Sequence, residues 1–377
     1  MAQRHLDPTD PMAGPVTGDA LAGYLRAQAT EFLRALRLHR ETGGSTANGS
    51  NGSHGSEDAV DAARALRRAV RRISGSLHTF RPLLDPDWSE SMRPELAWLS
   101  GTLAMEHAYA ARLERLLLAL YRLSGAVFPG QAAGVAVGGA SAGGGVSSRS
   151  AGADPGNAGP SPHPAPAPDR GNLTVGAAKA GALLERQLTL ARTRAHSTAL
   201  QALGSSRFHA VADNIAVLAS EVPLTATAPT TDLHPLAAAA EERLTDAVAA
   251  LPLVTAGSPY NAAALVHGLS PDPAPHPQDA PWHQVRLLLR LHRYAREVLD
   301  GEQGPVDVRL LTTGQALDRH RDASEAAAAA AQAARTPRIA PATAYALGVL
   351  HADQRHEVEA ARFTFQQSWQ KHTVGTP

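Results

Sequence analysis

Residues 282–299 read WHQVRLLLRLHRYAREVL, and this stretch decides the fold class because its charged and apolar residues recur with the period of an α-helix. At about 100° per residue, one histidine and three arginines fall within an arc of about 80°. These stripe residues are His283, Arg286, Arg290 and Arg293. The opposite side gathers Val285, Leu288, Leu289, His292, Ala295 and Leu299. Such a helix buries one face and directs several positive donors the other way, so the stripe requires water or an anionic partner.

Composition extends this helical signature to the whole chain. Its 377 residues are 44% hydrophobic, which suffices for a core, and only 4% aromatic. Alanine and leucine dominate while β-branched residues are sparse, a bias that favours helices packed on helices. We therefore expect an all-α protein. Because the chain has no cysteine, disulfides, thiolate metal sites and cysteine nucleophiles are excluded.

Charge and hydropathy restrict the choice of partner. The 35 lysines and arginines balance 35 aspartates and glutamates, so the net charge is zero. A protein whose whole surface attracts nucleic acid is usually distinctly basic, so we expect no nucleic-acid partner, and any anion site must come from locally concentrated charge. No segment approaches 18 uninterrupted apolar residues, and the first residues lack the pattern of a targeting peptide. We expect a cytoplasmic protein with no membrane partner.

Three stretches rich in glycine, proline or small polar residues interrupt the helical pattern. They are residues 43–57, 126–172 and 256–281. Elsewhere the periodicity predicts helices at about 18–42, 58–82, 87–125, 174–203, 206–221, 231–251, 281–301, 305–335 and 340–371. We expect one domain built from a tail over 1–17, a first helical half over 18–125, a linker over 126–172 and a second helical half over 173–372.

The two halves contain similar helices. Sliding ARALRRAVRRISGSLHTF (63–80) onto 282–299 without gaps aligns Arg64 with His283, Arg67 with Arg286 and Arg71 with Arg290. The apolar faces match as well. One repeated bundle unit would explain this, and a chance match between two arginine-rich amphipathic helices is the alternative.

These helices resemble the paired helices of the CHAD domain, the conserved histidine α-helical domain. Each half of that family carries His-x-x-Arg-x-x-x-[Lys/Arg]-Arg-Leu-Arg; the second half here reads HQVRLLLRLHRYA from His283, and the first reads RALRRAVRRIS from Arg64, followed by TFRPLLDPDW. The similarity extends to GDALAGYLRAQATEFL near the start, to residues 194–225, to ALDRHRDASEA (316–326) and to ATAYALGVLHADQRHEVEAARFTFQQSW near the end. It covers nearly the whole chain outside the three interrupting stretches.

The resemblance implies two pseudosymmetric antiparallel helical bundles around a central basic cavity that binds inorganic polyphosphate or a similar polyanion. It also adds Arg194 and Arg207 as weaker candidates for phosphate binding. The residues themselves agree with a phosphate chain, because successive stripe positions lie about 5 Å apart along a helix axis. Release of counterions would make such binding strongly salt-dependent.

The chain departs from the family pattern at several positions. Arg64 stands in place of the family's histidine, and Ser74 replaces a common arginine. Ala108 follows His107 where the family often has an Arg-Asp pair, and Glu241 and Glu242 lie in a helix that is usually basic. These departures are typical of a diverged member, in which polyphosphate affinity could be reduced or the ligand could differ.

Other motifs predict little chemistry. GASAG at 139–143 fits a hydrolase nucleophile pattern with Ser141, but it lies in glycine-rich low complexity rather than between a strand and a helix. The stretch HADQRHEVE offers four possible metal ligands: His351, Asp353, His356 and Glu357. Its two histidines are five residues apart, however, and so point to different faces of a helix. We interpret His292 as a core histidine bonded to a carbonyl, and His320 with Asp322 as part of a solvated helix face. The nearest match in this chain to the E-x-E-x-K pattern of triphosphatase domains has no lysine.

We therefore expect a non-enzymatic, polyphosphate-binding protein without cofactor or metal, possessing a shared basic cavity and associated with polyphosphate granules. The predicted phosphate-binding residues are Arg64, Arg67, Arg71, His283, Arg286, Arg290, Arg293, Arg194 and Arg207. A structural protein of the same fold, docking to another protein or to a granule with reduced polyphosphate affinity, is the first alternative. A phosphate-processing enzyme is the second, and the missing acidic metal site argues against it.

Overall fold

A computed structural model describes residues 16–45, 54–125, 170–258, 261–269, 276–301, 304 and 307–370. Within these ranges the regular structure is helical, apart from one isolated bridge between Leu84 and Leu224. The all-α prediction is confirmed. Residues 1–15 of the tail expected over 1–17, and residues 126–169 of the linker expected over 126–172, with Ser141 among them, lie outside the described residues.

The long helices follow the predicted order. They are α1 (Gly18–Ser45), α2 (His54–Thr79), α3 (Pro86–Ser124), α4 (Arg170–Leu203), α5 (Ser206–Ser220), α6 (His234–Ala249), α9 (Ala280–Asp300), α10 (Val308–Ala334) and α11 (Pro341–Gln370). Shorter helical segments are η1 (Arg81–Leu83), η2 (Ala228–Thr230), α7 (Leu253–Ala256), α8 (Ala262–Gly268) and η3 (Pro277–Asp279). Segments α8 and η3 fall within 256–281, so the prediction of an uninterrupted linker there is wrong. Helices α1 and α2 also extend into 43–57, which shortens that predicted linker at both ends.

Local sequence explains where several helices begin and end. The Asp85 carboxylate accepts a hydrogen bond from the Trp88 amide at 2.8 Å and caps α3, while Gly125 ends that helix at a φ of 67°. The Asp307 carboxylate caps α10 in the same way by accepting from the Leu310 amide at 3.1 Å. Each cap satisfies an amide that the first helical turn would otherwise leave without a partner.

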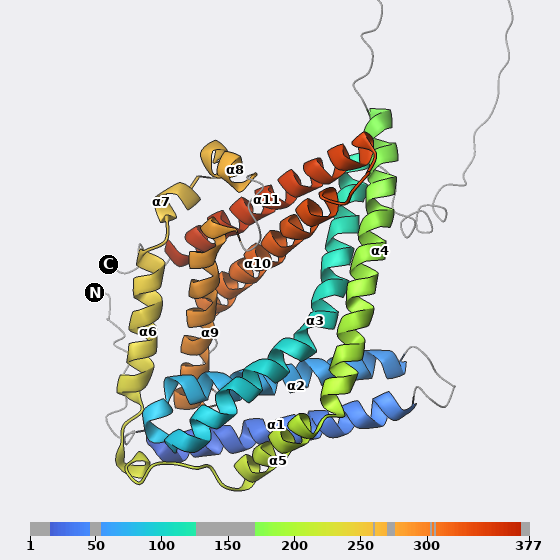
Figure 1. Cartoon of the computed structure of the whole chain (residues 1–377). Helices are drawn as coiled ribbons and strands as arrows, with labels where there is room; N and C mark the ends of the chain where they lie inside the picture. The colour runs from blue at the N-terminus through green and yellow to red at the C-terminus, as the bar shows by residue number, and fades with distance from the viewer. Residues whose placement is uncertain are drawn as a thin grey trace, which may run out of the picture.

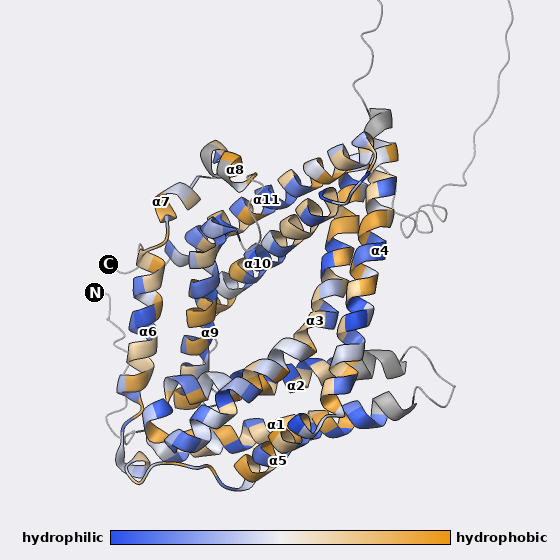
Figure 2. Cartoon of the chain, viewed as in Figure 1, coloured by the Kyte–Doolittle hydropathy of each residue, from blue (hydrophilic) through white to orange (hydrophobic). Residues whose placement is uncertain are grey.

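Three hydrophobic cores hold the helices together. The first joins α1, α2, the beginning of α3 and α5; the second joins the end of α3 with α4, α10 and α11; the third joins α6, α9, the beginning of α10 and Phe365 of α11. Figure 1 shows α3 and α4 running side by side, and Figure 2 shows orange and blue residues interspersed along them, as amphipathic helices require. Helices from the predicted halves 18–125 and 173–372 therefore share cores.

Helices α2 and α9, which carry the two stripes, cross each other (Figure 1). A Cβ added at Gly75 of α2 would lie 2.5 Å from Tyr294 Cδ2 of α9, so the glycine permits this close approach. The gapless overlay of the two stretches aligns Gly75 with Tyr294. Aligned positions of the two similar helices thus contact each other at the crossing.

None of the described helices combines the length and the apolarity that crossing a membrane demands.

Candidate functional site

Five arginines from three helices gather where α2, α9 and α10 approach one another. We call this set the arginine cluster, and its members are Arg67, Arg71, Arg286, Arg290 and Arg321. Their electrostatic effects on one another reflect this convergence, because Arg67, Arg71, Arg286 and Arg290 each have their pKa lowered in part by another member. The structure thus brings together four of the predicted stripe residues.

The α2 arginines lie in an environment that disfavours their charge. Burial, followed by the positive charges of Arg321 and Arg64, lowers the pKa of Arg67. Burial likewise lowers the pKa of Arg71, with further lowering from Arg67 and from Arg286 of α9. Neither Arg67 nor Arg71 forms an ion pair with a carboxylate in the described part of the chain, and the buried Nε atom of Arg67 has no hydrogen-bond partner there. These two guanidinium groups are available to an anion.

The α9 arginines share one carboxylate. Arg286 Nε donates to Asp318 Oδ1 at 2.5 Å, and Arg290 Nη2 lies 3.9 Å from the same oxygen. Burial and the positive charge of Arg290 lower the pKa of Arg286, while Asp318 opposes this effect. Burial also lowers the pKa of Arg290, and the aligned Arg71 contributes to the lowering. Since the Asp318 side chain is 56% exposed, its pairing with the cluster is accessible to competition.

Helix α10 presents acidic residues beside the cluster at a helical spacing. Asp318, Asp322 and Glu325 lie four and then three residues apart, which places them on one face. Asp322 Oδ1 accepts from Arg321 Nε at 3.0 Å, and Glu325 Oε2 accepts from Arg112 Nη2 of α3 at 2.5 Å. Cations still outnumber carboxylates here, so the region retains a local positive charge despite the neutral chain.

Two histidines border the cluster. Burial and the positive charge of Arg286 lower the pKa of His283, against the raising effect of Asp279. Burial, then Arg67 and Arg64, lower the pKa of His107 on α3. These shifts favour the neutral form of both imidazoles at pH 7.

A buried ionic network supports the α9 end of the site. Asp279 is fully buried and accepts from Arg355 Nη1 at 2.7 Å and from Arg362 Nη2 at 2.6 Å. The Ser324 hydroxyl also donates to Asp279, and His320 packs beneath His283 with ring centroids 5.4 Å apart. The network joins the start of α9 to α10 and α11. Burial would raise the pKa of Asp279, but the Arg355 guanidinium, His320 and the Ser324 hydroxyl hold it far below the ordinary range.

The remaining predicted residues lie elsewhere or are partly neutralised. Arg64 is half exposed and pairs with Asp61 at 3.1 Å, although its charge reaches Arg67. Arg293 lies in a separate cavity with α1 residues. Arg194 is exposed. Arg207 donates to Glu95 at 2.6 Å and lies 4.2 Å from the Trp98 ring centroid.

Two histidine interpretations can be compared with the structure. His320 is 1% exposed, so its assignment to a solvated face is wrong; the helix turns that side toward Asp279 and Arg362. His292 is buried as predicted, but its Nδ1 atom has no hydrogen-bond partner within the described residues. In the same part of the chain, no three acidic or histidine side chains are grouped to hold a metal, and the His351 Nδ1 instead lies 3.0 Å from the Ala327 carbonyl oxygen.

Comparisons with known proteins agree with this helical arrangement. The CHAD domain family matches residues 28–329. The chain belongs to the CHAD domain family. A solved structure, PptA from Streptomyces chartreusis, is 66% identical and superposes with a TM-score of 0.71, covering 95% of this chain and all of that one. No curated protein matches the chain.

Sequence reasoning missed several residues of this CHAD domain site. Arg321 and Arg112 come from helices without the stripe pattern, so only the packing of α3 and α10 against the stripes reveals them. The acidic face formed by Asp318, Asp322 and Glu325 could have been predicted from the sequence, because the three residues are spaced within DRHRDASE so that they share one side of a helix.

Proposed function

We propose that this CHAD domain binds inorganic polyphosphate without catalysing its turnover, and that the two stripes line one shared basic space. The observation that carries the proposal is the convergence of like charges from the two stripe helices: Arg71 of α2 lowers the pKa of Arg290 of α9, and Arg286 of α9 lowers the pKa of Arg71. Holding like charges close together costs free energy that a bound polyanion would relieve. Family membership supports a polyphosphate-related role.

The chemistry of the cluster suits a chain of phosphates. A guanidinium group donates two parallel hydrogen bonds to a phosphate, and arginines one helical turn apart meet successive groups of an extended chain. Arg67 and Arg71 would bind first because they lack ion-pair partners in the described structure. Arg286 and Arg290 would follow as the polyanion displaces Asp318.

Titration of long polyphosphate chains at several salt concentrations tests this proposal. The logarithm of the association constant should fall linearly with the logarithm of salt concentration, with a slope that reports the number of phosphates contacted. Reversing the charge of Arg286 and Arg290 together should abolish binding and leave helical circular dichroism unchanged. The paired change Arg37→Glu and Arg40→Glu, on an exposed part of α1, is the matched control. Absence of binding by the natural chain at low salt would exclude the proposal.

A structural or docking role of the same fold is the second candidate. The acidic face of α10 favours it, because Asp318 and Glu325 already pair with Arg286 and Arg112 and so reduce the charge available to a ligand. Under this alternative, a protein or granule partner would be captured from cell extract in the complete absence of polyphosphate. Treatment of the extract with a polyphosphatase before capture separates the two roles. We place the protein in the cytoplasm, at polyphosphate granules where these form, on the strength of the same proposal.

A further inference from the structure

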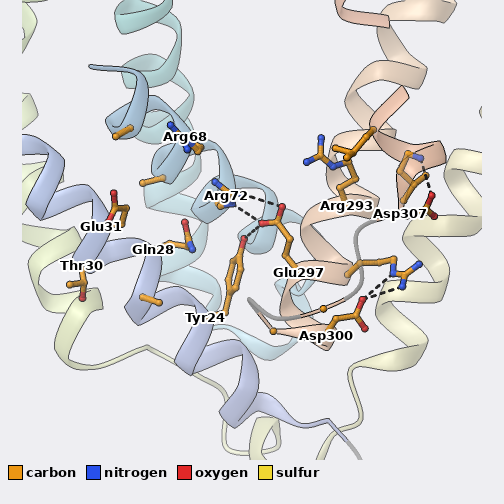
Figure 3. Close-up of a pocket in the computed structure, with 18 of the residues that line it drawn as sticks. Tyr24, Gln28, Thr30, Glu31, Arg68, Arg72, Arg293, Glu297, Asp300 and Asp307 are labelled. Atoms are coloured by element: carbon orange, nitrogen blue, oxygen red, sulfur yellow. Dashed lines mark hydrogen bonds and ion pairs between the residues drawn. The ribbon is translucent and has the colours of Figure 1, made fainter. Parts of the chain in front are cut away.

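A cavity of about 810 Å³ lies between α1, α2, the end of α9 and the beginning of α10 (Figure 3). This volume falls within the range of about 300–1,000 Å³ that small-molecule sites occupy. Four of its lining residues are labelled at its centre in Figure 3 and come from α1, α2 and α9: Tyr24, Arg72, Arg293 and Glu297. The cavity therefore has the size of a ligand site and walls from several packed elements.

The cavity is distinct from the arginine cluster. Arg71 of α2 lowers the pKa of Arg290 in the cluster, whereas the next residue, Arg72, donates to Glu297 Oε2 at 2.6 Å inside the cavity. No member of the arginine cluster lines the cavity, and neither Arg68 nor Arg293 of the cavity is among the main charges acting on the cluster.

The carboxylates of the cavity are already engaged. Glu297 accepts from both Arg72 and the Tyr24 hydroxyl, the latter at 2.9 Å. Glu31 accepts from Arg34 at 2.7 Å, and Asp300 accepts from Arg296 Nη2 at 3.1 Å. The fourth carboxylate, that of Asp307, caps α10 as described above. Three of the four are therefore paired with an arginine, whereas Asp307, whose partner is a backbone amide, keeps its negative charge at the edge of the cavity.

Two arginines of the cavity have no such partner. Arg68 of α2 and Arg293 of α9 form no ion pair within the part of the chain that the structure describes, and they lie on facing sides of the cavity (Figure 3). Two guanidinium groups supply the donors that a single phosphate group takes up in charge-assisted hydrogen bonds. This arrangement accounts for Arg293, which belongs to the α9 stripe in sequence but not to the arginine cluster.

The other walls indicate what is attached to that phosphate. Small and aliphatic side chains line the cavity: Ala27, Ala65, Ala69, Leu310 and Leu311. Among the described residues, five arginines and four carboxylates line it, so the net charge of this lining is too small to hold a long polyanion. We propose that the cavity binds a small organic phosphate monoester, with Arg68 and Arg293 holding the phosphate and the aliphatic wall contacting its carbon skeleton.

Calorimetric titration of the full chain with phenyl phosphate tests this site, with inorganic phosphate and phenol as partial ligands. Phenyl phosphate should bind more tightly than either, because only it uses both the guanidinium groups and the apolar wall. The double variant Arg68→Gln and Arg293→Gln should weaken binding at least about tenfold, since each charge-assisted hydrogen bond contributes appreciably. The matched variant Arg37→Gln, which removes an exposed charge outside the cavity, should leave binding unchanged.

The outcome of the phenyl phosphate titration is independent of the polyphosphate proposal. Loss of phenyl phosphate binding in Arg71→Gln with Arg290→Gln, but not in the cavity variant, would assign the phosphate to the cluster and overturn the second site. Absence of phenyl phosphate binding by the natural chain would also overturn it. Long polyphosphate should bind the cavity variant as it binds the natural chain, so failure of either site can be recognised separately. Circular dichroism of each variant establishes that it is folded.

Discussion

A polyanion that binds the arginine cluster must displace the Asp318 side chain from Arg286. This side chain pairs with Arg286 at 2.5 Å while remaining 56% exposed. Asp318→Asn should strengthen polyphosphate binding by about two- to fivefold, the equivalent of an exposed ion pair of up to about 1 kcal/mol. Affinity at fixed salt is the measurement. Asp213→Asn removes the same charge from an exposed position on α5 and controls for net charge; equal effects of the two changes would show that Asp318 does not compete with the ligand.

His283 gives the site a pH dependence. Burial and Arg286 lower its pKa in the free protein, and a bound polyanion would raise that pKa again. Binding therefore takes up a proton below about pH 6.5, so affinity should rise between about pH 7.5 and about pH 5.5. His283→Gln should diminish this rise. The measurement is polyphosphate titration of the natural protein and of His283→Gln at the two pH values. An identical rise in affinity for the two proteins would exclude His283 from the site.

At the scale of elements, the α2–α9 crossing sets the distance between the stripes. Gly75→Ala gains helix propensity but places a Cβ 2.5 Å from Tyr294 Cδ2, so the Tyr294 ring or the helices must shift. Stability should fall by about 1–3 kcal/mol, as overpacking does, and polyphosphate affinity should fall although no charge is removed. Gly101→Ala on α3, where a Cβ meets nothing within 4 Å, should instead stabilise the protein. Urea unfolding measures stability, and polyphosphate titration measures affinity. An unaltered affinity of the Gly75→Ala protein for polyphosphate would show that binding does not depend on the α2–α9 crossing.

The sequence predicted elements better than their contacts. Amphipathic periodicity predicts α9 within about a residue at each end, because the pattern that buries one helix face is local. By contrast, the position of Arg321 beside Arg67 depends on how α10 packs, which no local pattern contains. The same limit explains His320: its helix neighbours are polar, yet the partner that buries it, Asp279, lies 41 residues away in sequence. Segment α8 was missed because its proline-rich surroundings mask a short alanine-rich turn.

At the scale of the molecule, buried histidines predict loss of stability in mild acid. Burial lowers the pKa of His292 and holds that of His320 well below its ordinary value, whereas Glu241 opposes the shift at His292. Each such histidine contributes stability that is present above the pKa of about 6.5 that it has in the unfolded chain. This stability is lost as the pH falls through the lower pKa of the histidine in the folded protein. The urea midpoint should therefore fall between about pH 7.5 and about pH 5.5.

His292→Ile tests the origin of that loss. The overlay aligns His292 with Ile73, which is fully buried in α2, so isoleucine suits this position in the repeat. The change removes a buried polar atom without a described partner and should raise stability by about 1 kcal/mol at neutral pH. It should also reduce the loss in acid. His209→Gln, at an exposed position, should keep the full loss. A steeper loss in His292→Ile would contradict this assignment.

The central claim is that α2 and α9 direct their cations at one ligand, and single substitutions on each helix test it most directly. Arg71→Gln and Arg290→Gln should each weaken polyphosphate binding at least about fivefold at low salt, since each removes charge-assisted hydrogen bonds to the same chain. The measurement is the association constant of each variant beside Arg37→Gln, which should match the natural protein. If a substitution on one helix weakens binding while the aligned substitution on the other leaves it at the level of Arg37→Gln, the two helices do not share a ligand.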